Sequence, residues 1–209
     1  SVTLIIYAQQ ERLRLKSLWV WLMCCMTRRL HNHITYEDTV VDVLAQVAAY
    51  IRTGQGFVLI TPGDIKGGSA RDVGSLAVVA DTGEMTGYMS NGCIDQDILL
   101  QALDCLAAGT ARLLRYGDGS PFHDLTLPCG GTLSVWIDPA PDKAALVAAY
   151  EALLVRTPAT LIFYPASQTG PAFPAAITIV YRPKVTLTLA GRGAIFRATA
   201  KVANAIGFD

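Results

Sequence analysis

The sequence predicts an α/β domain built on a mixed sheet. Short runs of β-branched and aromatic residues alternate along the chain with segments in which apolar residues recur at helical spacing. The composition agrees, because 52% of the 209 residues are hydrophobic and only 16% are charged, which excludes a disordered or coiled-coil protein. A chain of this length buries a core without the help of disulfides.

The charge balance and the cysteine count narrow the class further. Lysine and arginine together number 17, as do aspartate and glutamate, so the formal net charge is zero. This balance indicates neither a nucleic-acid binder nor a protein drawn to anionic membranes, and a charged ligand must be held by a local site. The 5 cysteines have no regular spacing, which favours reduced thiols and a cytoplasmic location.

Residues 1–34 are expected to be a leader outside the domain proper. Their most apolar run, at 17–26, follows a basic stretch but is shorter than the ~20 residues that span a bilayer. No small-residue cleavage site follows it. Two interpretations remain open: residues 1–25 are a tag or upstream translation, with Met26 as the start, or they form an extra helix that packs on the domain or on a partner.

The domain is expected to begin with a helix. Thr35 and Asp38 have the spacing of a capping box, and apolar residues then recur at helical spacing until Gly54. A buried strand at 57–61 follows and ends at the Pro-Gly pair after it. The elements expected next are a glycine-rich loop at 64–74, a strand at 76–80 and a hairpin turn at 81–83.

The second half of the domain continues the alternation. A helix is expected to start near Cys93 and to end at Gly109, with Cys105 on its buried face. Strands at 111–116 and 132–137, a helix at 142–155 and a strand at 160–164 complete a domain over 35–164. Several prolines then predict a linker over 165–182.

Residues 183–209 predict the first strand, turn and helix of a Rossmann-like domain. Gly191 and Gly193 follow an apolar strand pattern and precede a helix, which is the context of a dinucleotide-binding turn. Phe196 stands where the third glycine of such a turn packs, and the acidic residue that grips the ribose would lie about 20 residues beyond the motif. NAD(P) binding by this chain is therefore not expected.

Cys93 and Cys129 are the first candidates for chemistry. Each lies beside glycines at a strand end or helix start, where backbone N–H groups and a helix dipole lower the pKa of a thiol. Such a thiolate is nucleophilic or metal-binding; the alternative is a small buried side chain that fills a tight turn. Asp95 and Asp97 suit the first turn of the helix electrostatically but oppose thiolate formation.

The glycine-rich loop offers a second candidate site. Lys66, Ser69 and Arg71 combine cationic donors and a hydroxyl with nearby backbone N–H groups, which suits a phosphate or another oxyanion. The loop is not a P-loop, and a solvated loop without a ligand is the alternative. The histidines do not have the spacing of a metal site, and the chain has no C-x-x-C motif.

Two ordered strings surround the cysteines: GGSARDVGSLAVVADTGEMTGYMSNGCIDQDI and, after it, RYGDGSPFHDLTLPCGGTLSVWIDP. Together they resemble the XdhC/CoxI family of accessory proteins for molybdenum hydroxylases such as xanthine dehydrogenase. The first cysteine loop of that family usually reads S-G-G-C with a glutamate two residues on, and this chain has Ser90-Asn91-Gly92-Cys93 with Asp95. The family's second loop, L-P-C-G-G, is matched fully by residues 127–131.

The resemblance implies a fold and a function. It implies an XdhC/CoxI-like domain followed by a Rossmann-like domain that is incomplete in this chain. It further implies a protein that binds the molybdenum cofactor in its molybdopterin form and keeps it while a sulfur transferase, a cysteine desulfurase, installs the sulfido ligand. The protein would then deliver the cofactor to the apo form of a molybdenum hydroxylase. Such a protein is a carrier and chaperone rather than an enzyme, and it is compatible with a homodimer.

The residues expected to contact the cofactor come from both cysteine loops, the glycine-rich loop and the C-terminal turn. They are Cys93 and Cys129, whose sulfur atoms would contact molybdenum, and Lys66, Ser69, Arg71, Ser90, Asn91, Gly92, Gly130, Gly131, Gly191 and Gly193. Two alternatives from other classes remain. One is a fragment of a nucleotide-dependent Rossmann oxidoreductase, and the other is a thiol redox protein that uses Cys93 and Cys129.

Overall fold

A computed structural model of the chain describes residues 33–35, 39–118, 120, 127, 130–163 and 176–208, all within a compact unit that spans residues 31–209. The described residues alternate between strands and helices, which confirms the predicted α/β class. The elements in chain order are β1 (His33–Thr35), α2 (Val40–Thr53), β2 (Phe57–Lys66), β3 (Ala77–Ala80), β4 (Glu84–Thr86), α3 (Asp95–Ala108), β5 (Arg112–Tyr116), β6 (Thr132–Asp138), α4 (Lys143–Leu154), β7 (Ala159–Phe163), β8 (Ile177–Tyr181) and α5 (Ala194–Ala205).

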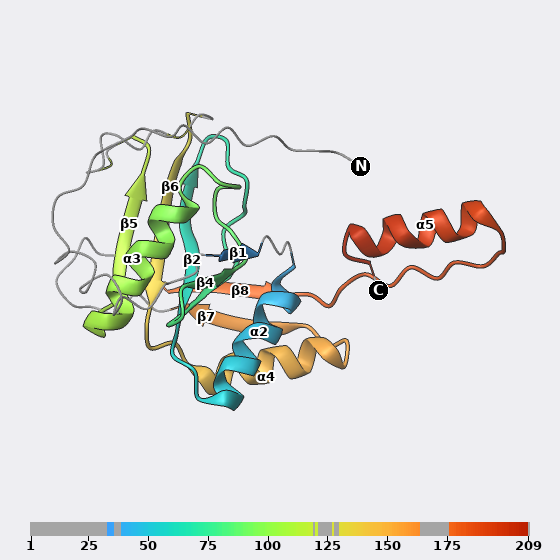
Figure 1. Cartoon of the computed structure of the whole chain (residues 1–209), viewed down its shortest axis with the longest axis horizontal. Helices are drawn as coiled ribbons and strands as arrows, with labels where there is room; N and C mark the ends of the chain where they lie inside the picture. The colour runs from blue at the N-terminus through green and yellow to red at the C-terminus, as the bar shows by residue number, and fades with distance from the viewer. Residues whose placement is uncertain are drawn as a thin grey trace, which may run out of the picture. The chain divides into compact units, whose positions relative to one another are not determined.

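Six of the strands form one mixed sheet in the order β1-β4-β3-β2-β6-β5 (Figure 1). β1 pairs with β4 in parallel, whereas the other neighbouring strands pair antiparallel. Because antiparallel neighbours run in opposite directions, β2, β4 and β5 all run one way, and β3 and β6 run the other way. The sheet is therefore mixed, as the sequence predicted.

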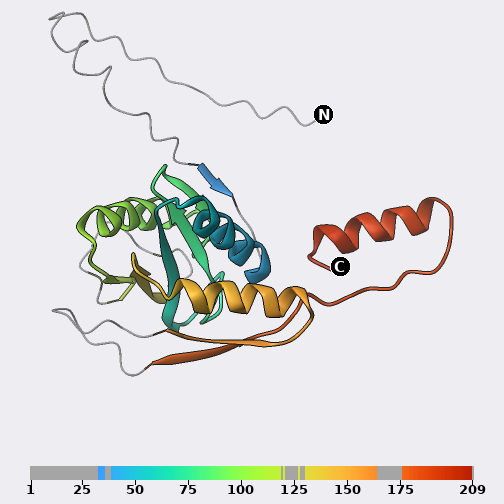
Figure 2. The same cartoon turned by 90° about the horizontal axis from the view of Figure 1, so that it is seen from below.

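Strand β2 is buried on both faces of the sheet. Successive side chains of a strand point to opposite faces. Val58 and Ile60 accordingly pack in the core beneath α3, while Phe57 and Leu59 pack in the core beneath α2 and α4. Figure 2 shows α3 on one side of the sheet and α2 with α4 on the other. A strand covered on both faces reads as a continuous apolar run, which is why FVLI is so apolar.

The antiparallel pair of β7 and β8 extends the second core. Leu161 and Tyr181 are buried in the same cluster as the apolar faces of α2 and α4. The opposite face of the pair is exposed, with Ile162 at 47% and Val180 at 58% of their surface. The Tyr181 hydroxyl donates a hydrogen bond of 2.6 Å to the carbonyl oxygen of Gly74. This bond ties the pair to the end of the glycine-rich loop.

The first helix starts later than the sequence predicted. Thr35 belongs to β1, so the expected capping box of Thr35 and Asp38 is wrong. The N-cap of α2 is Thr39, whose hydroxyl accepts a hydrogen bond of 3.3 Å from the backbone N–H of Asp42. Thr39 and Asp42 have the same three-residue spacing, so the correct signal lies four residues further along the chain. The predicted helix end at Gly54, which has left-handed backbone, is confirmed.

Strand β2 is longer than predicted. It does not stop at Pro62, because its pairing with β6 continues to Lys66 after a register shift between Pro62 and Asp64. Such a shift is a β-bulge, which absorbs one extra residue and bends the strand. β3 pairs with β2 only as far as Ile60. Pro62, which has no backbone N–H, therefore lies beyond the part of β2 that is hydrogen-bonded to β3. Lys66 is consequently the last residue of a strand rather than part of a loop.

Two expectations for the C-terminal third are wrong. Residues 177–181, expected within a linker, form β8, because β7 satisfies the hydrogen bonds of that stretch. Residues 185–190, expected as the first Rossmann strand, are irregular, and Val185 and Leu187 are exposed. A strand needs a neighbouring strand for its backbone N–H and C=O groups. None pairs with this stretch in the part of the chain that the structure describes. The helix expected after Gly193 is confirmed as α5.

Tyr181→Phe is expected to destabilise the fold by about 1–3 kcal/mol, because it leaves the carbonyl of Gly74 without its hydroxyl donor. The measurement is the midpoint of urea unfolding at neutral pH, with an unchanged m-value. Thr178→Val, on the exposed face of the same strand, is the matched control and should change stability by less than about 0.5 kcal/mol. Equal midpoints for Tyr181→Phe and the wild type would contradict this role.

The same tyrosine predicts a loss of stability at alkaline pH. Burial raises the pKa of Tyr181, so the folded state holds the phenolic proton more tightly than the unfolded state does. The stabilisation is complete below the pKa of an unfolded tyrosine, about 10, and is lost as the pH rises above it. Urea midpoints measured on both sides of about pH 10 should therefore fall less steeply in Tyr181→Phe than in the wild type. Parallel pH profiles would refute the prediction.

Candidate functional site

The predicted site residues of the glycine-rich loop, the first cysteine loop and the 130–131 pair lie at one end of the six-stranded sheet. β2, β4 and β5 run in the same direction and end there, and β6, which runs the opposite way, begins there. The segments at this end are residues 67–76 after β2, 87–94 after β4, Gly117 after β5, and 130–131 before β6. Segments that are far apart in the sequence thus lie at the same end of the sheet, an arrangement that the sequence did not predict.

The segment Met89–Ile94, here called the cysteine loop, presents Cys93 at the start of α3. Asn91 has φ 57° and Gly92 has φ 106°, both in the left-handed region that favours asparagine and glycine. Cys93 is exposed, so the alternative of a small buried side chain is wrong for this residue. Cys105, predicted as a core residue, is fully buried in α3. The thiol of Cys93 therefore faces solvent beside the first turn of a helix.

The carboxylate of Asp95 holds the cysteine loop from inside. Asp95 has no exposed surface. One of its oxygens accepts hydrogen bonds from the backbone N–H groups of Met89 at 2.7 Å and Ser90 at 3.1 Å. The other oxygen accepts from the Ser90 hydroxyl at 3.0 Å and from the N–H of Gly92 at 2.6 Å. The Ser90 hydroxyl in turn accepts the N–H of Ile94 at 2.8 Å, so the loop is closed on itself.

Glycines let the other loops touch backbone to backbone. A Cβ atom added to Gly131 would lie 2.2 Å from the carbonyl oxygen of Gly68, and one added to Gly117 would lie 2.2 Å from the carbonyl oxygen of Gly131. A Cβ on Gly67 would lie 3.2 Å from the Cα of Gly131. We call Gly67, Gly68, Gly117 and Gly131 the glycine junction. No side chain fits between its three segments.

A hydrogen bond connects the start of α3 to the glycine junction. The hydroxyl of Tyr116, the last residue of β5, donates to the carboxylate of Asp97 at 2.6 Å. Burial, and then the hydrogen bond to Asp97, raise the pKa of Tyr116, so its proton stays in place. Tyr116 directly precedes Gly117, and Asp97 lies in the first turn of α3. The cysteine loop and the junction are thus joined through two neighbouring elements.

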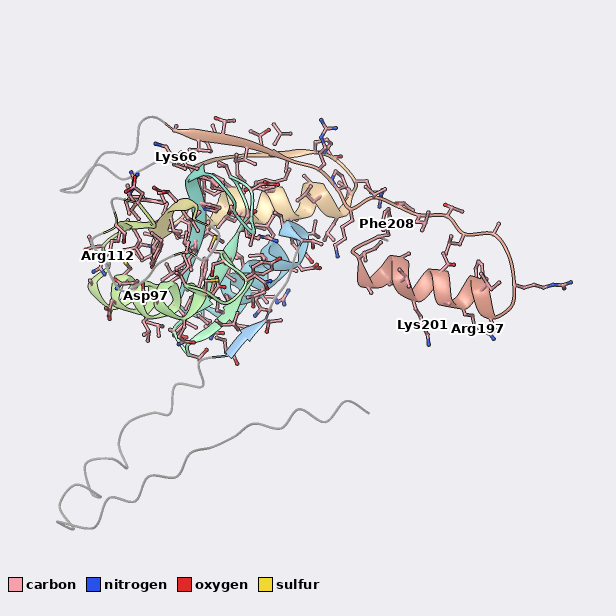
Figure 3. The ribbon with its side chains drawn as sticks, turned by 90° about the horizontal axis from the view of Figure 1, so that it is seen from above. Lys66, Asp97, Arg112, Arg197, Lys201 and Phe208 are labelled. Atoms are coloured by element: carbon pink, nitrogen blue, oxygen red, sulfur yellow. The ribbon has the colours of Figure 1, made fainter. Side chains whose placement is uncertain are left out.

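The cationic residues of the glycine-rich loop lie at the same end of the sheet. The Arg71 guanidinium lies 4.6 Å from the centroid of the Tyr88 ring, just before the cysteine loop. Ser69 donates its hydroxyl to the carbonyl of Arg71 at 2.8 Å and accepts the Arg71 N–H at 3.2 Å, so it shapes the turn. Lys66 is exposed at the end of β2, and Figure 3 shows it there, with Asp97 at the start of α3.

Two cavities among the described residues differ in their distance from these elements. One, of about 330 Å³, has Arg71, Asp72 and Val40 among its walls, so the glycine-rich loop borders a hollow at the start of α2. The other, of about 350 Å³, is lined by Trp136 and Asp138, toward the opposite end of β6, and by Phe163 at the end of β7. Burial raises the pKa of Asp138 there, although a hydrogen bond from the Ala140 N–H opposes the shift.

Several predicted residues are not part of this assembly. Cys129 lies outside the described residues, although Gly130 and Gly131 beside it are described. Gly191 and Gly193 precede α5, but the strand that a dinucleotide-binding turn requires is missing before them. His33 lies in β1, and the other two histidines, His31 and His123, fall outside the described residues.

The described residues include neither a metal-binding cluster nor a membrane-spanning helix. Within them no group of three or more histidine, cysteine, aspartate or glutamate side chains is arranged to hold a metal ion. Nor does any helix among the described residues combine the length and the hydropathy that crossing a bilayer requires.

The sequence missed the two residues that organise the site. In the sequence, both aspartates were assigned to the helix dipole, and Asp95 also to the family motif. In the structure, the Asp95 carboxylate closes the cysteine loop and the Asp97 carboxylate accepts a hydrogen bond from the Tyr116 hydroxyl. A signal was present for Asp95, because an aspartate beside Ser-Asn-Gly is typical of side chain to backbone hydrogen bonding. No sequence signal links Asp97 to Tyr116, which is 19 residues away.

Gly131→Ala is expected to destabilise the protein by more than about 2 kcal/mol, because its Cβ would overlap the Gly68 carbonyl oxygen. Gly130→Ala is the matched control: its φ of 66° is strained for alanine, but no atom lies within 4 Å of the added Cβ. Its cost should be about 1–2 kcal/mol. Urea unfolding measures both variants. A smaller loss for Gly131→Ala than for Gly130→Ala would show that the junction is not tightly closed.

Comparisons with known proteins agree with these features. Residues 50–117 match the model of the XdhC and CoxI family. The molybdenum cofactor insertion chaperone PaoD of Escherichia coli (strain K12) is 33% identical over 168 residues, which cover 76% of this chain and 53% of that protein. The chain thus spans about half the length of this curated relative.

A solved structure supports the fold. The crystal structure of a protein titled as a xanthine dehydrogenase from Bacillus halodurans superposes with a TM-score of 0.67, at 20% identity, over 80% of this chain and 60% of that one. At this identity the likeness concerns the fold alone. The family match lies over the elements that carry Cys93, Asp95 and Tyr116, and the identity to PaoD extends over three quarters of the chain. The chain belongs to the XdhC and CoxI family.

Proposed function

We propose that this chain binds the molybdenum cofactor, protects it during sulfuration, and assists its insertion into a hydroxylase of the xanthine dehydrogenase or CO dehydrogenase type. The observation that carries the proposal is an exposed thiol, Cys93, on a loop whose shape is held by a buried carboxylate. The name of the relative PaoD, a molybdenum cofactor insertion chaperone, supports the same cargo.

The donor set suits such a cargo. A thiolate is a soft ligand and suits a molybdenum or sulfur centre. Lys66 and Arg71 supply cationic donors for the cofactor's phosphate, and both lie at the end of the sheet where Cys93 is found. Selectivity for an anionic cargo then comes from these local charges, because the chain has no net charge.

The proposed contacts divide into two groups. Cys93 and, beside Gly130, Cys129 would contact the molybdenum centre, while Lys66, Ser69 and Arg71 would contact the phosphate. Ser90 and Gly92 were also expected to touch the cofactor, but their hydrogen-bond donors are directed to Asp95. Their part in binding is therefore to shape the loop. Asn91, two residues before Cys93, is exposed and would meet the cargo together with the thiol.

The carrier role is inferred from the exposure of Cys93, Lys66 and Ser69; Arg71 is half-buried. Exposed side chains on loops allow a ligand to be picked up and released, whereas a turnover enzyme encloses its substrate and excludes water. The partners we propose are a sulfur transferase of the cysteine desulfurase class and the apo-hydroxylase. A cytoplasmic location and a homodimer remain predictions.

A thiol redox function is the second candidate. It is favoured by Gly130, the residue that follows Cys129 in the sequence, because Gly130 lies at the same end of the sheet as Cys93. Mild oxidation would then produce a Cys93–Cys129 disulfide, which mass spectrometry of the digested protein detects. The oxidoreductase alternative has lost support, because the strand expected before Gly191 is irregular.

The cofactor-binding proposal is tested by co-elution. The full chain is mixed with molybdenum cofactor released from a molybdenum enzyme, and size-exclusion chromatography is followed by measurement of molybdenum and pterin in the protein peak. Cys93→Ser should lower retention at least about tenfold, equivalent to about 1.4 kcal/mol of binding free energy. Arg71→Gln should lower it less, because one of several phosphate donors is lost.

Lys201→Gln is the matched control for the charge change. Lys201 is exposed on α5 and is labelled in Figure 3. It belongs to none of the segments that form the candidate site. It should retain the cofactor as the wild type does. No retention by folded wild-type protein would overturn the carrier function. Equal retention by Cys93→Ser and the wild type would overturn the role of the thiol.

A further inference from the structure

We propose that Asp95 is the positioning residue of this site. Its carboxylate accepts the hydrogen bonds that the cysteine loop turns inward, and it thereby fixes the position of the Cys93 thiol. The part of this inference that concerns cofactor retention rests on the proposed function. The part that concerns the position of the thiol does not.

The cysteine loop has the form of a backbone anion site. Asn91 and Gly92 have positive φ, and backbone turns can direct neighbouring N–H groups toward one point. Here the N–H groups of Met89, Ser90 and Gly92 all point at a single carboxylate, at 2.6 to 3.1 Å. The anion that occupies the loop is thus part of the chain itself.

This arrangement has a consequence for the ligand. Those N–H groups are engaged by Asp95, so they are not the donors that bind a phosphate of the cargo. The phosphate must be bound by other groups, and Arg71 and Lys66 are the cationic candidates at this end of the sheet. Within the cysteine loop, the cargo would then be contacted by the exposed side chains of Cys93 and Asn91 rather than by these N–H groups.

The energetics favour a rigid loop. A buried carboxylate is stable only when its oxygens are hydrogen-bonded, and Asp95 meets this requirement with four donors. Opening the loop would leave the charge buried without partners, so the closed form is strongly preferred. The loop cannot move without Asp95, and Asp95 belongs to α3, whose apolar face is part of the core. The position of Cys93 is therefore set by the core.

A spin label on Cys93 measures this directly. In the full chain, Cys24, Cys25 and Cys129 are replaced by serine and the buried Cys105 is kept, so a nitroxide reagent reacts at Cys93. Asp95→Asn keeps the size of the side chain but replaces an acceptor oxygen with an amide donor that faces the loop N–H groups. The room-temperature spectrum of this variant should show a clearly more mobile label, under conditions in which circular dichroism shows a folded protein.

Two further variants keep the test decisive. Ser90→Ala removes one donor to Asp95 and the acceptor of the Ile94 N–H, and should raise label mobility by a smaller amount; it replaces Asp95→Asn if that variant does not fold. Asp104→Asn, an exposed carboxylate on the same helix, should leave the spectrum unchanged. The positioning role would be overturned if the label were as immobile in Asp95→Asn as in the wild type. If Asp95→Asn is unfolded, the same comparison is made with Ser90→Ala.

Cofactor retention then tests the link to function. In chains with unlabelled Cys93, Asp95→Asn should lower retained molybdenum about 10- to 100-fold, the range typical of groups that orient a metal ligand. Unchanged retention despite a mobile label would overturn the link. If the wild type itself retains no cofactor, the carrier function fails, while the spin-label result still decides whether Asp95 positions the thiol.

Discussion

The structure depends on the burial of strand β2 against two cores. Its side chains alternate between the cluster beneath α3 and the cluster beneath α2 and α4, so neither core can form without it. Pairing with β3 on one side and β6 on the other fixes its register. A one-residue slip would exchange the two faces of the strand and disturb both cores at once. The position of Lys66, and of the glycine-rich segment that follows β2, is therefore set by the packing of the two cores.

The site is a consequence of this constraint. Strands β2, β4 and β5 run in one direction, so the segments that follow them arrive at the same end of the sheet. The cysteine loop is closed by Asp95, the glycine junction is closed by backbone contact, and Tyr116 with Asp97 joins the two. These contacts use buried or partly buried side chains, or glycines that have no side chain. The exposed thiol and the cationic side chains are left to meet a ligand.

The closed cysteine loop positions a thiol but does not bind an external anion, although one loop could have done both. Backbone N–H groups in left-handed turns commonly bind phosphates. In this chain an internal carboxylate occupies them, so the loop contributes position rather than charge. Under the proposed function, the negative charge of the cargo would instead be bound by the side chains of Lys66 and Arg71. Such a carrier would release its cargo by losing side-chain contacts while the cysteine loop stays intact.

Much of the architecture was predictable because it depends on local patterns. Helices α3, α4 and α5 and strands β3, β5, β6 and β7 lie close to where periodicity and turn residues placed them. Errors occurred where tertiary partners decide. Pro62 ended a predicted strand, yet β6 carries that strand on to Lys66 through a bulge. The stretch at 185–190 has strand composition but no neighbouring strand among the described residues, so it stays irregular.

The sequence by itself determined the α/β class, the position of Cys93 at a helix start and the tolerance of Asn91 for left-handed backbone, since each follows from residues close together in the chain. Only the tertiary structure decided that Gly131 touches Gly68, that Tyr116 bonds Asp97, and that Asp95 faces inward rather than toward solvent. These contacts join residues through strand order and burial, and neither is written in local periodicity. Pairing direction in the sheet is the physical reason that separate motifs became one site.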